Sequence, residues 1–538
     1  MSAVHAMDTR VLLDRYAGEF SDGSPKGWIV SKDERGYAFT LPNGALIHSA
    51  ELQDESIWTQ IPQKDSNTTI LWRNSLAYLV RLFELELSPP SVETARNVVE
   101  SFLRWIEHKS AEDPKSLKSG SLDHQGALRI RTLMSLISTL SRTGDFENLE
   151  IFQSLFNRLI VVEERLLEHL DLYQPNNHGI MLGMAHLHAS SLFPASAQLR
   201  DASDWVKALY ETLGQIIDSD GIASENTPIY QVFYVSLIED VVAFLIWSGR
   251  FPGKVRLFQL LLRAAQMGVQ RQLLPNGAVP PLGDSPGGMQ HRFKPLLGML
   301  WSPANGLAIS SSESSYLSFI AGFKSVIHKQ LDELSVSWWV NGEFVLRDAG
   351  LLSYDQGDPI AASMRGHQGH SLPTYAKFDS WTTRETISFG KNSSRLRAHL
   401  ISKEQKSDST NFVGKLNFDG NEILQRTVCL SGKNRLSITD NFNARSYGAA
   451  LVRFVFDPSL KVESHEDGNE IVLLSASRRV VVNFRGEGNK TPISSVVKQT
   501  HVAIQHYSAA STNELLITAV DAEIPFRIET EILVKDIG

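Results

Sequence analysis

Apolar residues between about residues 68 and 268 recur at the three- and four-residue spacing of an amphipathic helix. One example is the face formed by Val98, Phe102 and Ile106. The helical segments are separated by short breaks, such as SPPS at residues 88–91. Because short connections favour antiparallel helix pairs, this half is predicted to be all-helical, with the pairs arranged in an arc or ring around a cleft.

After about residue 305 the pattern changes to shorter runs rich in Val, Ile, Phe and Thr, which are typical of strands. The pairs Asn341–Gly342 and Asp419–Gly420 stand where two-residue hairpin turns would join neighbouring strands. The second half of the chain is therefore predicted to be antiparallel β structure, in the form of a sandwich.

The composition is that of a globular chain long enough for two or three cores: 538 residues, 42% of them hydrophobic and 21% charged. The net charge of −8 argues against general nucleic-acid binding, but it allows a locally basic cleft for an anionic glycan. The single cysteine, Cys429, cannot form an internal disulfide and is predicted to be a buried, inert thiol.

The first residues do not show the charged and then apolar pattern of a secretory signal. No later segment approaches the roughly 20 uninterrupted apolar residues of a membrane span. We therefore expect a soluble, cytoplasmic protein with no membrane partner; a periplasmic or secreted location would need another export route.

Four stretches concentrate polar side chains between apolar runs. In QPNNHGIMLGMAHLHAS, Asn177 and His178 precede a helix-like segment, where an asparagine is often only a helix cap. In DSDGIASENTPIYQVFYVSL, Pro228 suits the first turn of a helix. That helix would carry Tyr230 and Tyr234 on one face, although tyrosines in cores are commoner than catalytic ones.

The third stretch, LPNGAVPPLGDSPGG, is a Pro/Gly-rich loop that contains Asp284 and is predicted to form a structured turn. The fourth, VIHKQLDELSVSWWVNGEFVLRDAG, brings together His328, Gln330, Asp332 and, beyond a hairpin, Asp348. A His-x-His pair on a strand would place both rings on one face and indicate a metal site, but Gln330 occupies the second place and weakens that signal.

Taken in this order, the four stretches resemble motifs of the heparinase II/III-like polysaccharide lyases. Members of that family show an Asn-His pair that opens a toroid helix, which Asn177 and His178 match, and a DG…E.SP.Y segment, which residues 220–230 match. A PDG.IP…DS loop corresponds to PNGAVPPLGDS, and an H.H.D.LSF…NG…L.D.G segment corresponds to residues 328–350. The resemblance covers about residues 175–370 by motif and the rest of the chain by architecture only.

The resemblance implies a multidomain α+β fold, an incomplete α/α toroid followed by an antiparallel β-sandwich. With the sequence pattern, it divides the chain into a small β-hairpin region at residues 1–60, a toroid domain at 61–304 and a sandwich domain at 305–538. The hairpin region is expected because residues 27–52 alternate between apolar and polar positions.

For function, the resemblance implies β-elimination at a uronic acid of an acidic polysaccharide or oligosaccharide, such as a glycosaminoglycan, alginate or a bacterial exopolysaccharide. The C5 proton is scarcely acidic while the neighbouring carboxylate is charged, so that carboxylate must first be neutralised. The resemblance gives this task to Asn177, with His328 assisting. It makes Tyr230 the acid that protonates the leaving O4 oxygen, and either His178 or Tyr230 itself the base.

Three further residues, Glu225, Tyr234 and Gln330, are expected to contact the substrate. The family often carries a zinc ion in the sandwich, and the resemblance places its ligands at Gln330, Asp348 and His370. An amide oxygen is a poor zinc ligand, so Asp348 and His370 would bind zinc weakly unless His367 supplies a third ligand. The alternative is a metal-free site in which Gln330 hydrogen-bonds Asp348 or His370.

Two other functions stay open on the sequence. A glycoside hydrolase on the same kind of toroid could use Asp218, Asp220 and Glu225 as paired acids, although these residues also suit a cap for the following helix. A glycan-binding protein without catalysis is suggested by Gln330 and by Gln231, which stands where relatives often have histidine and is expected to affect the choice of substrate. Retention of the four catalytic candidates argues against that alternative. The oligomeric state is not predicted.

Overall fold

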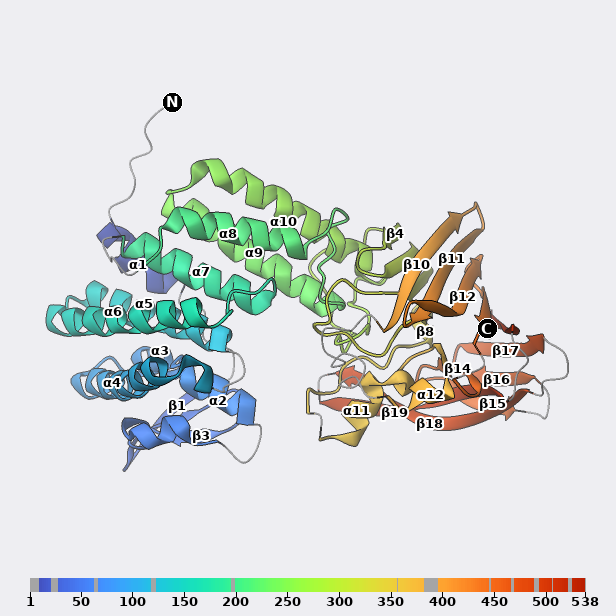
Figure 1. Cartoon of the computed structure of the whole chain (residues 1–538), viewed down its shortest axis with the longest axis horizontal. Coiled ribbons are helices and arrows are strands. Elements are labelled where there is room, and N and C mark those ends of the chain that lie inside the picture. The colour runs from blue at the N-terminus through green and yellow to red at the C-terminus, as the bar shows by residue number, and fades with distance from the viewer. Residues whose placement is uncertain are drawn as a thin grey trace. The chain divides into compact units, whose positions relative to one another are not determined.

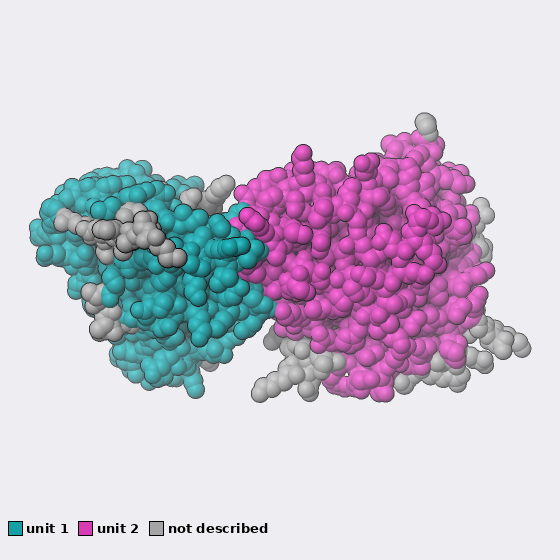
Figure 2. Space-filling model, turned by 90° about the horizontal axis from the view of Figure 1, so that it is seen from above, with its two compact units in different colours: residues 1–216, 236–260 teal, residues 217–235, 261–538 magenta. Residues whose placement is uncertain are grey.

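The computed structural model describes residues 9–20, 28–61, 66–117, 122–194, 199–355, 357–381, 395–444, 447–465, 469–487, 493–505, 507–520 and 525–537. The chain divides into two compact units (Figure 2): unit 1 consists of residues 1–216 and 236–260, and unit 2 consists of residues 217–235 and 261–538. The change from helices to strands falls between Gln272 and Gly298. The predicted three-part division with limits at residues 60 and 304 stays a prediction.

Long helices make up most of unit 1, as the apolar spacing predicts (Figure 1). Helix α5 packs against α6 and α7, and α7 packs against α8. Val98, Phe102 and Ile106 of α4 are all buried, which confirms the predicted apolar face. The helices of the first half are α1 (Thr9–Phe20), α2 (Ser66–Asn74), α3 (Tyr78–Leu85), α4 (Pro89–Glu112), α5 (Leu122–Thr143), α6 (Phe146–His169), α7 (Asn177–Leu192), α8 (Ala202–Ile216), α9 (Pro228–Ser248) and α10 (Pro252–Gln272).

A three-stranded antiparallel sheet follows α1 and precedes the other helices. Its strands are β1 (Ile29–Asp33), β2 (Gly36–Thr40) and β3 (Leu46–His48). The first two form a hairpin in the stretch where the sequence alternates, and β3 adds a third strand to it.

Helix α9 is, among the described helices, the one that is long and apolar enough to cross a membrane by length and composition. Half of its apolar window is buried inside the protein, as is common for a core helix. Its first two turns belong to unit 2 and the rest to unit 1.

Antiparallel strands make up most of unit 2, in three sheets. The orders are β4-β5-β6-β7-β8, β10-β11-β12-β13-β20-β17-β16-β15 and β18-β19-β14-β9. One apolar core joins all three sheets, and Trp338, Phe412 and Phe454 each contribute to it from a different sheet. Along β11 buried and half-buried positions alternate, because one face of that sheet covers the core. The predicted α+β fold class is confirmed.

The elements of this half are β4 (Gly298–Ser302), β5 (Leu307–Ser312), β6 (Ser315–Ile320), β7 (Ser335–Val340), β8 (Glu343–Leu346), α11 (Pro359–Arg365), β9 (Pro373–Tyr375), α12 (Ala376–Asp379), β10 (Leu396–Gln405), β11 (Ser409–Phe418), β12 (Asn421–Ser431), β13 (Arg435–Phe442), β14 (Ala450–Val455), β15 (Lys461–His465), β16 (Glu470–Leu474), β17 (Arg478–Glu487), β18 (Ile493–Gln505), β19 (Ser508–Ala519) and β20 (Phe526–Asp536).

Both predicted hairpin turns are confirmed. Asn341 and Gly342 join β7 to β8 with φ angles of 43° and 104°. Asp419 and Gly420 join β11 to β12 with φ angles of 50° and 81°. Two consecutive positive φ angles are what a tight two-residue hairpin needs, and Asn, Asp and Gly reach them at the lowest cost.

Cys429 lies in β12, with its Sγ 3.8 Å from Ser431 Oγ. Its side chain is half-buried, so the thiol is less buried than predicted.

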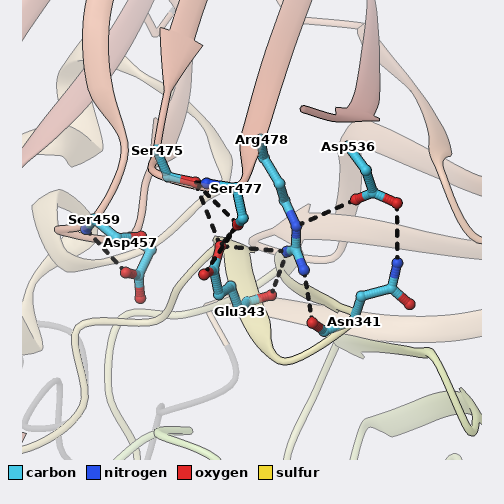
Figure 3. Close-up of polar contacts among 8 residues, drawn as sticks. All are labelled: Asn341, Glu343, Asp457, Ser459, Ser475, Ser477, Arg478 and Asp536. Atoms are coloured by element: carbon cyan, nitrogen blue, oxygen red, sulfur yellow. Dashed lines mark hydrogen bonds and ion pairs between the residues drawn. The ribbon is translucent and has the colours of Figure 1, made fainter. Parts of the chain in front are cut away.

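Polar side chains tie the β7–β8 hairpin to the start of β17 (Figure 3). The Glu343 carboxylate accepts hydrogen bonds from the hydroxyls of Ser475 and Ser477. Arg478 donates from Nη2 to the backbone carbonyl of Asn341 at 2.7 Å, and its Nε lies 3.7 Å from Asp536 Oδ1. These contacts link the five-stranded sheet to the eight-stranded sheet at its β17–β20 strands.

A buried ion pair fastens the loops of the sandwich to the eight-stranded sheet. Arg426 on β12 donates from Nε and Nη2 to the two carboxylate oxygens of Asp440 on β13, at 2.7 and 2.8 Å. Its Nη1 donates to the carbonyls of Leu334, at 3.0 Å, and Ser371, at 2.8 Å. Leu334 immediately precedes β7, and Ser371 follows His370, so one guanidinium holds both segments against the sheet.

Replacing Arg426 by methionine should destabilise unit 2 by about 3–5 kcal/mol, because it leaves the Asp440 carboxylate buried without its partner. Replacing both residues, as Arg426→Met with Asp440→Leu, should recover much of that loss. Denaturant unfolding of the two variants beside the parent measures the difference. Equal losses for the single and double variants would contradict this account of the pair.

Candidate active site

The four predicted catalytic residues fall into two clusters, one in each unit. Asn177 and His178 lie in unit 1, and Tyr230 and His328 lie in unit 2. That all four surround one sugar ring stays a prediction.

Asn177 is not the N-cap of α7. Asn176 is the N-cap, and its side chain accepts a hydrogen bond from the backbone N–H of Gly179 at 2.9 Å. Asn177 is therefore the first residue of the helix, and the capping role considered for it belongs to its neighbour. Residue 179 must be glycine, because a Cβ there would lie 1.9 Å from the carbonyl oxygen of Gln174.

His178 forms a carboxylate–imidazole pair with a residue that the sequence analysis missed. Its Nδ1 lies 3.3 Å from Oδ1 of Asp123, in the first turn of α5, and its side chain is 30% exposed. Burial alone would raise the pKa of Asp123, but the hydrogen bond and the charge of His178 outweigh it and lower that pKa. A third side chain, His124, lies with its ring centre 4.9 Å from that of His178, and burial lowers its pKa to about 4, so it is neutral near pH 7.

Tyr230 and His328 stack on each other in unit 2. Their ring centres are 3.7 Å apart and the planes are inclined by 24°. Tyr230 lies in the first turn of α9, which begins at Pro228 as predicted. The hydroxyls of Tyr230 and Tyr354 lie 3.3 Å apart, and the Tyr354 hydroxyl lies 3.4 Å from Nδ1 of His328. Tyr354 is 45% exposed and was not predicted as a site residue.

Two carboxylates flank the imidazole of His328. Its Nδ1 lies 3.0 Å from Oδ2 of Asp284, and its Nε2 lies 3.6 Å from Oε2 of Glu225. Asp284 was predicted only as part of a structured turn; its contact with His328 could not be seen in the sequence because 43 residues separate the two positions along the chain.

Burial and these negative charges keep the phenols protonated. Burial raises the pKa of Tyr230 above its usual range, the carboxylates of Asp284 and Glu225 raise it further, and the hydrogen bond with Tyr354 partly opposes them. Burial is also the largest cause that raises the pKa values of Tyr354 and Tyr234. The charged groups that act on Tyr230 are thus both anionic, and an anionic surrounding disfavours a phenolate.

Two of the three predicted substrate contacts lie behind the site. Tyr234 is fully buried, and its hydroxyl donates to Oε1 of Glu225. Gln330 is 1% exposed and donates from Nε2 to Oδ1 of Asp284 at 2.8 Å. Neither side chain reaches the surface, so the prediction that Tyr234 and Gln330 touch the substrate is corrected: they support Glu225 and Asp284. Glu225 itself is buried beside His328.

Gln231 is also a supporting residue. Its side-chain oxygen accepts from the backbone N–H of Ala223, and its Nε2 donates to the carbonyls of Gly221 and Ala265. The side chain is buried, and its hydrogen bonds connect the turn before α9 to α10. The prediction that Gln231 affects the choice of substrate is therefore not supported by its position.

The zinc that the family resemblance implies does not fit the residues present. Nδ1 of His370 lies 2.8 Å from Oδ2 of Asp348, so the two predicted ligands hydrogen-bond each other. Gln330 bonds Asp284, and not Asp348 or His370 as the metal-free alternative proposed. Within the described residues, no group of three or more His, Cys, Asp and Glu side chains could hold a metal ion, so His367 does not complete the set.

A buried ammonium already supplies positive charge in this region. Lys329 is 3% exposed, pairs with Asp332 and lies 3.7 Å from Oε2 of Glu333. Burial alone would lower the pKa of Lys329, but Asp332, Glu333 and Asp348 outweigh it and raise that pKa, so the side chain is a cation. The same balance holds for His370, where burial lowers the pKa and the Asp348 carboxylate raises it above its usual value.

Comparison with known proteins agrees with this architecture. Residues 295–529 match the model of the family described as heparinase II/III-like, C-terminal. No curated protein sequence matches the chain. A heparinase III structure superposes with a TM-score of 0.65 at 14% identity, covering 100% of this chain and 87% of that chain. A heparan sulfate lyase from Pedobacter heparinus gives 0.56 at 14% identity, covering 98% of this chain and 84% of that one.

At such low identity the two structures are evidence of a shared fold, and that fold is the predicted one. The family match falls on the strand-rich half and includes His328 and the hairpin that follows it. Residues 295–529 thus belong with the heparinase II/III-like, C-terminal family, and the whole chain shares the fold of the two solved structures.

Proposed function

We propose that this chain cleaves an acidic, uronic-acid-containing polysaccharide or oligosaccharide by β-elimination and leaves a C4=C5 double bond in one product. The observation that carries the proposal is the stacked pair of Tyr230 and His328, in which a protonated phenol lies against an imidazole flanked by two carboxylates. The activities named for the similar solved structures, heparinase III and heparan sulfate lyase, belong to the same reaction class.

The first step is neutralisation of the uronate carboxylate, because removal of the C5 proton adds a second negative charge beside it. Asn177 and His328 take this role: the amide N–H and the imidazole can each donate to a carboxylate oxygen as the enolate develops. Removal of one such donor from an enzyme site typically costs about 3–4 kcal/mol of transition-state stabilisation.

Tyr230 acts as the acid. Burial and the nearby carboxylates raise its pKa, so the hydroxyl keeps its proton until a strongly basic alkoxide forms at the leaving O4 oxygen. The same environment makes Tyr230 a poor base, because a base must already be a phenolate before the reaction, with a third negative charge beside Asp284 and Glu225.

The base is therefore His178. Its Nδ1 faces Asp123, which leaves Nε2 to accept the C5 proton, and the carboxylate stabilises the imidazolium that results. Because acid and base are then different residues, the proposed reaction suits a sugar whose C5 proton and O4 oxygen lie on opposite faces of the ring.

The hydrolase alternative loses support from the placement of its acids. Asp218 accepts hydrogen bonds from the backbone N–H groups of Asp220 and Ile222 and from the side chains of Ser302 and Asn305. These bonds occupy both carboxylate oxygens in a turn. Asp218 is therefore a structural residue and not one of a pair of catalytic acids.

Incubation with a panel of heparan sulfate, hyaluronan, chondroitin, alginate and bacterial uronans should give ultraviolet absorbance with at least one polymer. Elimination conjugates the new C4=C5 bond to the carboxylate, whereas hydrolysis makes no such chromophore. New reducing ends without the absorbance would contradict the proposal and favour a hydrolase. Binding of a polymer without either product would favour the glycan-binding alternative.

Tyr230→Phe should lower kcat by about a hundredfold or more, because it removes the transferable proton and keeps the ring that stacks on His328. KM should change by only a few fold. Steady-state kinetics on the best polymer of the panel measures both. Tyr210→Phe, which removes a hydroxyl from an exposed tyrosine on α8, is the matched control and should leave both constants unchanged. Equal activity of Tyr230→Phe and the parent would remove Tyr230 from the mechanism.

Zinc should not be needed. After incubation with zinc and desalting, the protein is expected to retain far less than one metal ion per chain, and a chelator should change neither its melting temperature nor its activity. Gln330→His supplies the imidazole that the family pattern has at this position and should increase zinc retention. About one zinc ion per chain in the parent protein, measured by elemental analysis, would contradict the metal-free account.

A further inference from the structure

The carboxylate of Asp284 is the most heavily used buried charge near the proposed site. Asp284 is 1% exposed, and both of its oxygens are engaged. Oδ2 lies 3.0 Å from Nδ1 of His328, and Oδ1 accepts from Nε2 of Gln330 at 2.8 Å. Arg365 lies with Nε 3.7 Å from Oδ1 and supplies the countercharge. A buried carboxylate held on both sides in this way cannot rotate without losing a bond to one of its partners.

The loop that carries Asp284 is fixed by its backbone. Gly283 has a φ of 55°, and a Cβ at that position would lie 2.9 Å from the carbonyl oxygen of Asn226. On the other side of Asp284, the backbone N–H of Ser285 donates to the carbonyl of Leu282 at 3.2 Å. The Pro/Gly composition of the loop therefore brings it close to the turn before α9, and Asp284 points from a tightly held backbone.

The backbone of His328 is held just as firmly. The side chain of Asn226 donates to the carbonyls of Ser325 and Ile327, at 2.7 and 2.8 Å. His328 itself has a φ of 55°, in the left-handed region that non-glycine residues seldom adopt. A residue keeps such a conformation only where its surroundings determine it. Here the surroundings are the Asn226 amide on the main chain and the Asp284 carboxylate on the ring.

We infer that Asp284 is a positioning residue, which accepts the proton on Nδ1 of His328 and so fixes the orientation of its ring, while Gln330 holds the second carboxylate oxygen. The inference rests on the proposed lyase function, in which His328 meets the uronate carboxylate. A carboxylate that receives Nδ1–H sets both the orientation of an imidazole and the nitrogen that faces the reacting group. Gln330 thus acts on His328 through Asp284.

A double-mutant cycle tests whether Asp284 acts through His328. Asp284→Ala should lower kcat by at least about a hundredfold in the parent, as expected for a lost imidazole orientation. In a His328→Ala background the same change should have an effect within about twofold. Ser285→Ala, next to Asp284 in the same loop and with a buried hydroxyl that has no hydrogen-bond partner, is the matched control and should keep the parent rate. A hundredfold further loss in the His328→Ala background would overturn the inference.

Nuclear magnetic resonance of the full chain, labelled with nitrogen-15 in histidine, reads the ring directly. The His328 signal, assigned by its loss in His328→Ala, should show a proton on Nδ1 in the parent protein without substrate. In Asp284→Ala, part of the neutral ring should shift to the form with its proton on Nε2. A neutral ring protonated on Nε2 alone in the parent would overturn the inference, even where Asp284→Ala fails to fold.

The two readouts separate this inference from the proposed function. Absence of an unsaturated product with every polymer would count against the lyase, while the proton position on His328 would still report on Asp284. Elimination by the parent together with additive losses in the cycle would leave the lyase standing and remove Asp284 as a positioning residue.

Discussion

A buried carboxylate must be neutralised or hydrogen-bonded on every side, and at Asp284 this requirement organises the centre of unit 2. One residue in a Pro/Gly loop bonds both His328 and Gln330, which are two positions apart in the segment that leads into β7. The Asp284 carboxylate thereby joins its own loop to the segment that leads into β7. Arg426 serves the same segment further along, where it holds the carbonyl before β7 to the eight-stranded sheet.

In the proposed mechanism, the electrostatic surroundings distinguish the chemical roles more than the residue types do. A tyrosine can serve as acid or base, and the motif alone allows either. In this chain the charged groups that act on Tyr230 are the carboxylates of Asp284 and Glu225, so the proton is held more tightly, which supports the acid role that we propose for Tyr230. His178 has its own carboxylate partner, Asp123, in unit 1, which would stabilise the imidazolium formed in the proposed base role.

Local patterns in the sequence predicted the helices, both two-residue hairpin turns and the start of α9 at Pro228, because each depends on neighbouring residues. The partners of the site residues could not be predicted in this way. Asp123 looks like an ordinary acid in a first helical turn, and Tyr354 stands in a loop without a motif. Gln231 and Tyr234 lie close to Tyr230 in the sequence, yet both side chains are buried. Their burial depends on how the turn before α9 packs, which the sequence does not show. Contacts between distant segments decide these cases.

The central claim is that the bond at O4 breaks by elimination and not by addition of water. The most direct test is a mass balance on a purified uronate oligosaccharide of defined length, cleaved to completion by the parent protein. The account predicts that the masses of the two products add up to the mass of the substrate, with the double bond at the non-reducing end of one of them. Products whose masses together exceed that of the substrate by one water molecule would contradict it.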